Sequence, residues 1–283
     1  MRIQNSFSND CPTLYLVATP IGNLTEFSPR AIEILNSVDI VAAEDTRNGK
    51  KLLDYFDIKK KLISHHEHNS GNSTKGIIDL LQEGNNVALI SDAGYPLMCD
   101  PGTFLVDQAI EKGFNVVTIN GPSAMLCALT ASGISPHPFY FHGFLPHNVN
   151  EGRRQLEKLK SFENTMVFYE SVHRIINTLQ LMLEVLGDRK ICVARELTKI
   201  HEQFLTGVIS EVIDNLTQIK GEFVIVIEGN KELVKKDINE DLVLEIDQLV
   251  SSNLSVKEAI KEISKKYGLS KNEVYQFYHQ EKE

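Results

Sequence analysis

Short apolar segments alternate with amphipathic ones along the first 120 residues, and this alternation limits the possible folds more than any other feature of the chain. Residues 13–18 (TLYLVA) and 87–90 (VALI) are rich in β-branched and large apolar side chains, as buried strands are. Parallel strands need long crossover connections, whose helices cover both faces of the sheet. The alternation therefore predicts a mostly parallel sheet between two layers of helices. The expected strands are 13–18, 39–43, 62–64, 87–90 and 116–119, and the expected helices are 29–38, 48–56, 73–83 and 102–112.

The pattern starts again after residue 120, where a turn and an apolar helix at 121–133 lead into a second series of strands. The run FVIVI at 223–227 is typical of a central strand that is buried on both faces. We therefore expect an α/β fold with a second αβα domain, built on a mixed sheet. Its expected strands are 139–142, 165–169, 190–194, 203–208 and 222–228, and its further helices are 150–160, 171–186 and 209–219.

The C-terminal residues differ from both halves. Ser255 and Ser270 each begin an S-x-x-E capping box, and Gly268 between them is a candidate helix C-cap. This pattern predicts two helices and a turn, but residues 237–283 carry six lysines against ten acidic residues, which disfavours DNA binding. We expect a small helical appendage. The predicted domains are 1–120, 121–232 and 233–283.

Composition limits the compartment and the partners. No apolar stretch approaches the ~20 residues of a membrane helix, and the polar N-terminus is unlike a signal peptide. The four cysteines form no C-x-x-C pair, which favours a reducing, cytoplasmic setting without a zinc ribbon. The net charge of −9 disfavours general nucleic-acid binding, but residues 47–61 hold six basic and two acidic side chains. That stretch either contacts phosphates or is simply a solvated helix face.

Two loops after expected strands have the composition of a ligand site. Residues 18–23 (ATPIGN) and 91–96 (SDAGYP) combine tight turns with exposed backbone amides, and Asp100-Pro-Gly102 follows the second loop. Ligands of open parallel sheets bind beyond the carboxyl ends of the strands. Carboxylates that accept from an ammonium and amides that donate to a carboxylate suit the amino-acid end of a methionine-type cofactor. The alternative is a pair of ordinary Asp-initiated turns.

Four further strand ends carry clusters of titratable side chains. Residues 44–47 (EDTR) and 64–69 (SHHEHN) lie in the first half, and residues 168–174 (FYESVHR) and 194–199 (ARELTK) lie in the second. The histidines invite a metal interpretation, but no further ligand pair completes a site, so we predict no metal. Acid–base chemistry or polar recognition of a substrate fits the clusters better. Glu170 and Arg174 alone are also explained by an i, i+4 ion pair.

Together these segments resemble the ribosomal RNA ribose 2′-O-methyltransferases of the tetrapyrrole-methylase superfamily. The matching segments, in the order of the family, are LYLVATPIGNL, VAAEDTR, SHHEHN, ALISDAGYPLMCDPG, NGPSA, GFLP, VFYESVHR, VARELTKIHE and KGEFVIVIEG, from residue 14 to residue 229. Tyr95 stands where the family commonly has Thr. The resemblance implies two αβα domains, usually in a homodimer, with S-adenosylmethionine in the cleft between them. It implies a cytidine in the decoding region of the small ribosomal subunit RNA (16S rRNA) as the substrate.

The resemblance also implies roles for individual residues. Those expected to bind the cofactor are Pro20, Gly22, Asp92, Ala93, Gly94, Gly121, Pro122, Ser123, Ala124, Tyr169, Glu196 and Leu197. A positioned base would assist the ribose hydroxyl, and the candidate catalytic residues are Asp45, Glu44, Glu170, Arg47 and His68. Guanidinium and ammonium groups suit phosphates, and the candidate substrate-binding residues are Arg47, His66, Arg174, Lys50 and Lys51.

Two other functions stay open at this stage. A methyltransferase of the same superfamily that acts on a tetrapyrrole or a diphthine intermediate would have the same fold and cofactor. The polar clusters favour RNA, because a porphyrinoid pocket does not need so many groups that can bind phosphate. A protein that binds the cofactor or RNA without catalysis is the second alternative, and the retained clusters argue against it.

Overall fold

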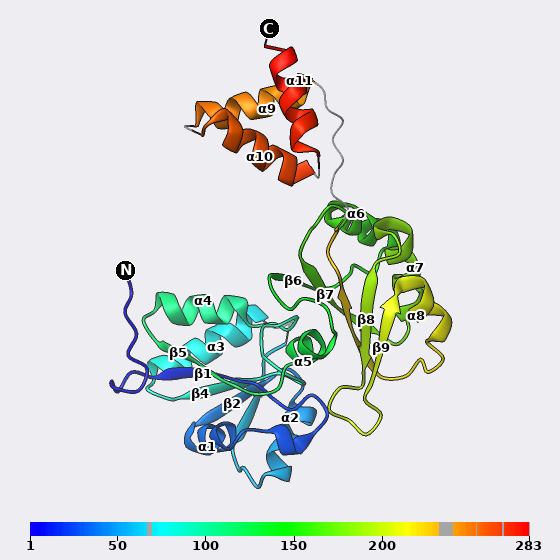
Figure 1. Cartoon of the computed structure of the whole chain (residues 1–283). Helices are drawn as coiled ribbons and strands as arrows, with labels where there is room; N and C mark the ends of the chain where they lie inside the picture. Colours follow the sequence, from blue (N-terminus) through cyan, green and yellow to red (C-terminus); the bar gives the residue numbers. More distant parts are fainter. Residues whose placement is uncertain (67–69, 232–239, 253, 268, 283) are drawn as a thin grey trace. The chain divides into compact units, whose positions relative to one another are not determined.

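The computed structural model describes residues 1–66, 70–231, 240–252, 254–267 and 269–282 (Figure 1). The chain forms two compact units. The first contains Met1–Lys160 and Asn164–Glu228, and the second contains Ser161–Glu163 and Gly229–Glu283.

The first sheet is parallel throughout and has the strand order β3-β2-β4-β1-β5. Its strands are β1 (Thr13–Val17), β2 (Ile40–Ala43), β3 (Lys61–Ser64), β4 (Val87–Ile90) and β5 (Asn115–Ile119). Every residue of β2 and β4 is buried, which agrees with their apolar sequences. Val17 pairs with Ile90 on one side and Ile119 on the other, so these strands end at one edge of the sheet.

Helices cover both faces of this sheet. One face packs against α1 (Pro29–Ser37) and α2 (Thr46–Tyr55), and the other against α3 (Ser70–Gln82) and α4 (Thr103–Glu111) (Figure 1). Helix α1 begins where the sequence predicts, because the Ser28 hydroxyl accepts a hydrogen bond from the Ala31 amide at 3.1 Å.

The second sheet is mixed, with the order β6-β7-β10-β8-β9. Its strands are β6 (Phe139–Phe144), β7 (Thr165–Ser171), β8 (Lys190–Arg195), β9 (Gln203–Val208) and β10 (Glu222–Ile227). Strands β6 and β7 are parallel, and the other pairs are antiparallel. Strand β10 is central and buried from Phe223 onward, as its apolar run predicts.

Helix α5 (Ala124–Ala131) covers one face of the second sheet, with Ala128 and Leu129 packed against β7, β8 and β10. Helices α6 (Val149–Leu159), α7 (Ile175–Leu186) and α8 (Ile209–Asn215) lie on the other side in Figure 1. The parallel first sheet and the mixed second sheet, each with helices on its faces, confirm the predicted fold class.

The second unit consists of α9 (Glu240–Ser251), α10 (Val256–Tyr267) and α11 (Lys271–Gln280), packed around a small apolar core. The capping box at Ser255 is confirmed, since Ser255 and Glu258 bond to each other's backbone amides at 3.0 and 3.3 Å. The second capping box is wrong, because the Ser270 side chain makes no capping hydrogen bond. The predicted C-cap, Gly268, lies outside the described residues.

Each predicted strand is present, with ends within two residues of the expected positions. The predicted domain boundaries at residues 120 and 232 stay predictions. Within the described part of the chain, no helix is both long and apolar enough to cross a membrane.

Two leucines of α5 test how much the packing of this helix stabilises the fold. Leu129 is 2 % exposed in the core beside the second sheet, and Leu126, on the same helix, is 46 % exposed. The substitution Leu129→Ala should lower the free energy of unfolding by about 2–5 kcal/mol, because it leaves a cavity in the core. Leu126→Ala, the matched control, should change it by less than about 0.5 kcal/mol. Urea denaturation of both variants measures the difference, and equal midpoints would contradict the packing described here.

Candidate active site

A cavity of about 450 Å³ lies in the first unit. It lies between the carboxyl ends of the strands of the first sheet and the ends of several strands of the second sheet. The loops after β1, β2, β4 and β5 form one wall. The ends of β6 and β7, the start of β10 and the loop after β8 form the other. This is where open parallel sheets bind ligands. The predicted site residues that line the cavity are Glu44, Asp92, Ala93, Gly94, Ser123, Ala124, Tyr169, Glu170 and Leu197.

Backbone hydrogen bonds tie the loop after β4 to the loop after β1. Thr19 and Gly94 exchange two N–H···O bonds of 2.8 and 3.0 Å. The Ser91 hydroxyl donates to the Gly94 carbonyl at 2.8 Å, and the Thr19 hydroxyl donates to the Ser91 carbonyl at 3.1 Å. These bonds fix the backbone of residues 91–94, so that Asp92 and Ala93 form part of the cavity wall.

Tyr95 connects the same loop to the turn before α5. Its hydroxyl accepts a hydrogen bond from the Gly121 amide at 3.2 Å. A threonine hydroxyl, attached directly to Cβ, would not reach this amide from the same backbone position. Gly121 itself lies against the end of β1, where an added Cβ would come within 3.0 Å of the Ala18 carbonyl oxygen. The turn can pass this close only because residue 121 has no side chain.

The loop continues through a strained segment into Asp100. Leu97 and Cys99 both have left-handed backbone, with φ of 71° and 75°. For residues other than glycine this conformation costs of the order of 1 kcal/mol and persists only where the surroundings hold it. The Cys99 sulfur packs against Gly143 of β6, where an added Cβ would lie 2.9 Å from it. Asp100 follows directly and lies half-buried in the cavity wall.

Three carboxylates line the cavity on the side of the first sheet: Glu44, Asp92 and Asp100. Asp92 accepts hydrogen bonds from the Asp45 amide at 3.3 Å and from the Asn48 side chain at 2.9 Å. Burial, followed by the negative charges of Glu44 and Asp92, raises the pKa of Asp100 to about 7. Asp100 is therefore only partly ionised near neutral pH.

Asp45 and Arg47 lie at the start of α2, outside the cavity lining. The Asp45 carboxylate accepts from the Arg47 guanidinium at 2.5 and 3.0 Å and caps the helix by accepting from the Arg47 amide at 2.8 Å. These hydrogen bonds lower the pKa of Asp45 to about 2. The Arg47 side chain is 85 % exposed, and Lys50 and Lys51 on the same helix are exposed as well.

Glu170 is buried and engaged on both carboxylate oxygens. It accepts from the Thr178 hydroxyl at 2.6 Å and from the Ser171 amide at 2.7 Å, and it forms an ion pair with Arg174 at 3.4 Å. Arg174 also donates to the carbonyls of residues 145–146 at 3.0 Å. The i, i+4 ion pair that the sequence suggested is present, and these contacts join β7 to the segment that follows β6.

Aromatic and apolar side chains form the wall on the side of the second sheet. The Tyr169 hydroxyl accepts a hydrogen bond from the Met125 amide at 3.2 Å, and burial raises the pKa of Tyr169 to about 12. Its ring packs edge-on against Phe144, with 5.7 Å between centroids, and Phe144 is 50 % exposed at the cavity. The other apolar lining residues from both sides include Ile21, Met98, Leu197, Phe223 and Val224.

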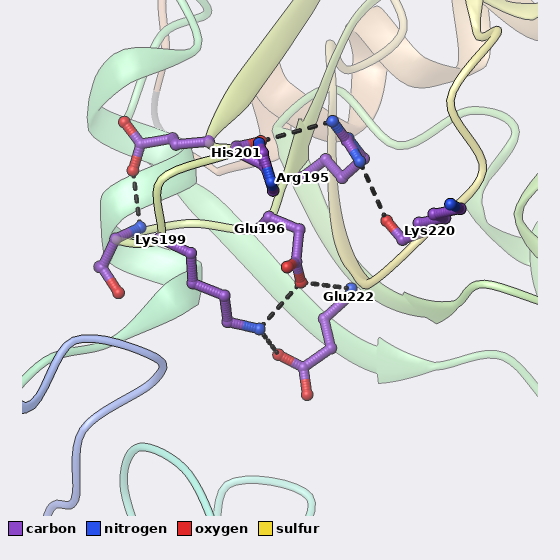
Figure 2. Close-up of polar contacts among 8 residues, drawn as sticks. Arg195, Glu196, Lys199, His201, Lys220 and Glu222 are labelled. Carbon is purple, nitrogen blue, oxygen red and sulfur yellow. Dashed lines mark hydrogen bonds and ion pairs between the residues drawn. The ribbon is translucent and has the colours of Figure 1, made fainter.

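Figure 2 shows an ion cluster that includes Glu222, which lines the cavity. The Lys199 ammonium contacts Glu196 at 2.8 Å and Glu222 at 3.2 Å, and this lowers the pKa of Glu196. The Lys199 side chain also lies across Gly22, where an added Cβ would be 2.5 Å from Cε. Glu196 is thus held by Lys199, while its neighbour Leu197 lines the cavity.

Arg195 anchors the same loop through a second set of hydrogen bonds (Figure 2). It is 5 % exposed, and its guanidinium donates to the carbonyls of His201 and Lys220 at 3.4 and 3.3 Å. These bonds hold the loop after β8 against the segment before β10.

The histidine cluster after β3 is only partly described. His65 is 1 % exposed, its Nδ1 lies 2.8 Å from the Ser73 hydroxyl, and burial lowers its pKa. His66 is half-buried and does not line the cavity. His68 lies outside the described residues, so the structure does not place it.

Several predicted site residues do not line the cavity. They are Pro20, Gly22, Gly121, Pro122, Glu196, Asp45, Arg47, Lys50, Lys51, His66 and Arg174. Pro20, Gly22, Pro122 and Glu196 are each adjacent in sequence to a lining residue. Their individual roles stay predictions.

Other lining residues were not assigned a role from the sequence: Ile21, Tyr95, Met98, Cys99, Asp100, Phe144, Ser171, Glu222, Phe223 and Val224. For Asp100 the sequence did carry a signal, since it begins a second turn of an acid and a glycine directly after the loop at residues 91–96. Met98 and Phe144 look like ordinary core residues in the sequence.

The raised pKa of Asp100 makes stability depend on pH. Its folded pKa of about 7 lies above the ordinary aspartate value of 3.8, so the folded state loses stability as the pH rises from about 4 to about 7. Asp100→Asn has no charge to bury, so its stability relative to the natural protein should grow between about pH 5 and about pH 8. Thermal denaturation across that range measures this difference, with Asp107→Asn, at an exposed position of α4, as the control. A difference that does not vary with pH would contradict the raised pKa.

Comparisons with known proteins agree with this geometry. Residues 13–213 match the family model of Tetrapyrrole (Corrin/Porphyrin) Methylases. The chain is 46 % identical over 288 residues to the ribosomal RNA small subunit methyltransferase I of Bacillus subtilis, covering 99 % of both chains. It is 45 % identical over 289 residues to the protein of the same name from Halalkalibacterium halodurans, covering 99 % of this chain and 100 % of the relative.

Among solved structures, the methyltransferase CobJ matches with a TM-score of 0.57 and 17 % identity, over 78 % of this chain and 95 % of that one. At this identity the likeness concerns the fold alone. Tetrapyrrole methylases and the rRNA methyltransferase relatives depend on S-adenosylmethionine. The chain belongs to the tetrapyrrole methylase family and, within it, to the ribosomal RNA small subunit methyltransferase I proteins.

Proposed function

We propose that this protein methylates the 2′-hydroxyl of a cytidine in the decoding region of 16S ribosomal RNA, with the assembled small subunit as its substrate. The observation that supports this most is the meeting of the matched motifs: four loops from separate parts of the first sheet and three strand ends of the second line one cavity. The curated relatives named ribosomal RNA small subunit methyltransferase I align with 99 % of the chain.

The residues around the cavity fit S-adenosylmethionine, which supplies a methyl carbon bound to a positively charged sulfur. Carboxylates on one wall suit its positive charges, and the amides at the start of α5 suit its carboxylate. The aromatic and apolar wall suits the adenine. We assign cofactor contacts to Asp92, Ala93, Gly94, Ser123, Ala124, Tyr169 and Leu197. Pro20, Gly22, Gly121, Pro122 and Glu196 shape the backbone behind them.

Most of the rate enhancement in a methyl transfer comes from alignment of the acceptor oxygen, the methyl carbon and the sulfur. The hydrogen-bonded loops after β1, β4 and β5 supply rigid walls for this alignment. Of the acids predicted to be catalytic, Glu44 and Glu170 line the cavity, whereas Asp45 lies outside the lining and is paired with Arg47. Glu44 and Glu170 are therefore better placed than Asp45 to face a bound acceptor.

We propose that the RNA backbone lies along the exposed start and middle of α2. Arg47, Lys50 and Lys51 project from this helix, whose first residues adjoin the cavity through Glu44 and Asp92. A small basic rim of this kind suits docking onto an assembled particle better than tight binding of naked RNA by a chain of net charge −9. A homodimer and a cytoplasmic location belong to the same proposal and rest on the resemblance.

Methyl transfer to ribosomal subunits tests the function directly. Small subunits that lack the modification, incubated with the protein and labelled S-adenosylmethionine, should yield label in 2′-O-methylcytidine after nuclease digestion. Binding of the cofactor is measured in parallel by calorimetry. Cofactor binding without label on subunits or naked RNA would contradict the RNA substrate and would direct the search to tetrapyrrole or diphthine acceptors.

Charge reversal on α2 tests the proposed rim. The double substitution Lys50→Glu with Lys51→Glu should weaken subunit binding and reduce the slope of log affinity against log salt by about 1 per lost phosphate contact. Lys75→Glu with Lys112→Glu is the control, because these exposed lysines belong to α3 and the end of α4, on the other face of the first sheet. Equal salt slopes for both double variants would show that α2 does not contact the RNA.

A further inference from the structure

Asp100 is the titratable residue of the cavity that has no role so far. Asp92 is held by the Asp45 amide and Asn48, and Glu170 by Thr178, Ser171 and Arg174. In contrast, the Asp100 carboxylate makes no hydrogen bond or ion pair within the part of the chain that the structure describes. It is nevertheless half-buried and lines the cavity.

We propose that Asp100 is the general base that takes the proton from the methylated hydroxyl, and that the charge of Glu44 tunes it for this task. The inference rests on the proposed function only in requiring a hydroxyl group as the acceptor.

The backbone before Asp100 is built to hold this side chain in place. Leu97 and Cys99 both have left-handed backbone, which local preferences of the chain do not favour. The contact of the Cys99 sulfur with Gly143 holds the segment against β6. Strain of this kind concentrates at functional sites, because a structure must supply contacts to maintain it. A mere surface turn between β4 and α4 would not need it.

The electrostatic surroundings of Asp100 suit a base. Glu44 faces it from the loop after β2, Asp92 and Cys99 from its own loop, and Tyr169 from β7. Glu170 and Glu222 line the same cavity, and the lining that the structure describes contains no basic side chain. His65 lines a small adjoining space beside Glu44 and Asp100, and burial lowers its pKa.

Burial and then the charges of Glu44 and Asp92 raise the pKa of Asp100 to about 7. A general base is most effective when its pKa lies near the working pH, since it is then both deprotonated often enough and basic enough. Asp45, whose pKa is lowered to about 2 by Arg47, is a poor base by the same criterion.

The chemical step balances with these groups alone. The hydroxyl proton moves to a carboxylate oxygen of Asp100 while the hydroxyl oxygen bonds to the methyl carbon. The carbon–sulfur bond breaks, and its electron pair stays on the sulfur, which becomes a neutral thioether. Asp100 becomes neutral at the same time, so one positive and one negative charge disappear together. The proton then leaves Asp100 for solvent.

Single-turnover methylation of unmodified small subunits, with the protein in excess and S-adenosylmethionine saturating, tests the proposal. Asp100→Asn should slow the transfer by about 10²–10⁴-fold. The Kd of this variant for S-adenosylmethionine should stay within about threefold of the Kd of the natural protein. Asp100→Glu, which keeps a carboxylate, should recover part of the rate. Asp107→Asn, at an exposed position of α4, is the control for replacing an aspartate by an asparagine.

The pH dependence separates a base from a merely structural residue. The base must be deprotonated, so the rate of the natural protein should rise with pH through one acidic limb and then level off. Glu44→Gln removes a negative charge that raises the pKa of Asp100. The acidic limb in the pH–rate profile of this variant should therefore shift to lower pH. The positive charge of the bound sulfonium lowers the pKa of Asp100 in the natural protein and in Glu44→Gln alike. The quantity to measure is therefore the difference in pH between the acidic limbs of the two proteins. Asp100→Asn should lose the limb altogether.

The outcomes divide cleanly. Loss of cofactor affinity in Asp100→Asn, with a normal rate at saturation, would make Asp100 a cofactor ligand and overturn the proposal. An acidic limb that persists in Asp100→Asn, or that does not move in Glu44→Gln, would overturn it as well. If the natural protein itself methylates no ribose, the proposed function fails first and this inference fails with it. An active natural protein with an equally active Asp100→Asn rejects this inference alone.

Discussion

The arrangement of the site depends on the parallel pairing of β1 with β4 and β5. Because parallel strands run in one direction, the chain leaves every strand of the first sheet at the same edge, and the loops that follow them meet there. The pair of backbone hydrogen bonds between Thr19 and Gly94 extends this pairing beyond the strands into the loops. Asp92, Tyr95 and Asp100 keep their positions because their loop continues the sheet in this way.

The two sides of the cavity differ in chemistry. The loops after the strands of the first sheet contribute three carboxylates among their lining residues, and the second sheet contributes mainly aromatic and aliphatic side chains. A ligand with a charged end and a flat apolar end is therefore oriented before any catalytic group acts. Burial, followed by the negative charges of Glu44 and Asp92, raises the pKa of Asp100 and so makes its ionised form costly to the folded protein. Stability and function are opposed at this place, as is common at functional sites.

The sequence predicted the elements well because their signals are local. Buried strands such as β4 and β10 are continuous apolar runs, and Ser28 with Pro29 marks the start of α1 without reference to the rest of the chain. The second capping box was wrong because Ser270 has the right spacing to Glu273, but its side chain does not turn toward the helix amides.

The site was predicted in outline and missed in detail. The motif loops were expected to meet at one rim, which follows from the direction of the strands. Which side chain of each loop reaches the cavity depends on backbone angles that no sequence pattern reports, such as those of Leu97 and Cys99. Phe144 lines the cavity because β6 carries a register shift between Phe141 and Gly143, and Glu196 is occupied by a lysine three residues away.

The contact between Lys199 and Gly22 joins segments that are far apart in the chain but share one small volume. Neither residue can change freely while the other stays as it is, since any side chain at position 22 occupies the space of the lysine stem. Because Gly22 also has φ of 147°, at which any side chain is strained, a shorter residue at position 199 would not by itself make room for a larger one at position 22. In related sequences we therefore expect position 22 to stay glycine wherever a long side chain crosses it. The contact of the Lys199 side chain with Gly22 thus joins the loop after β1 to the loop after β8.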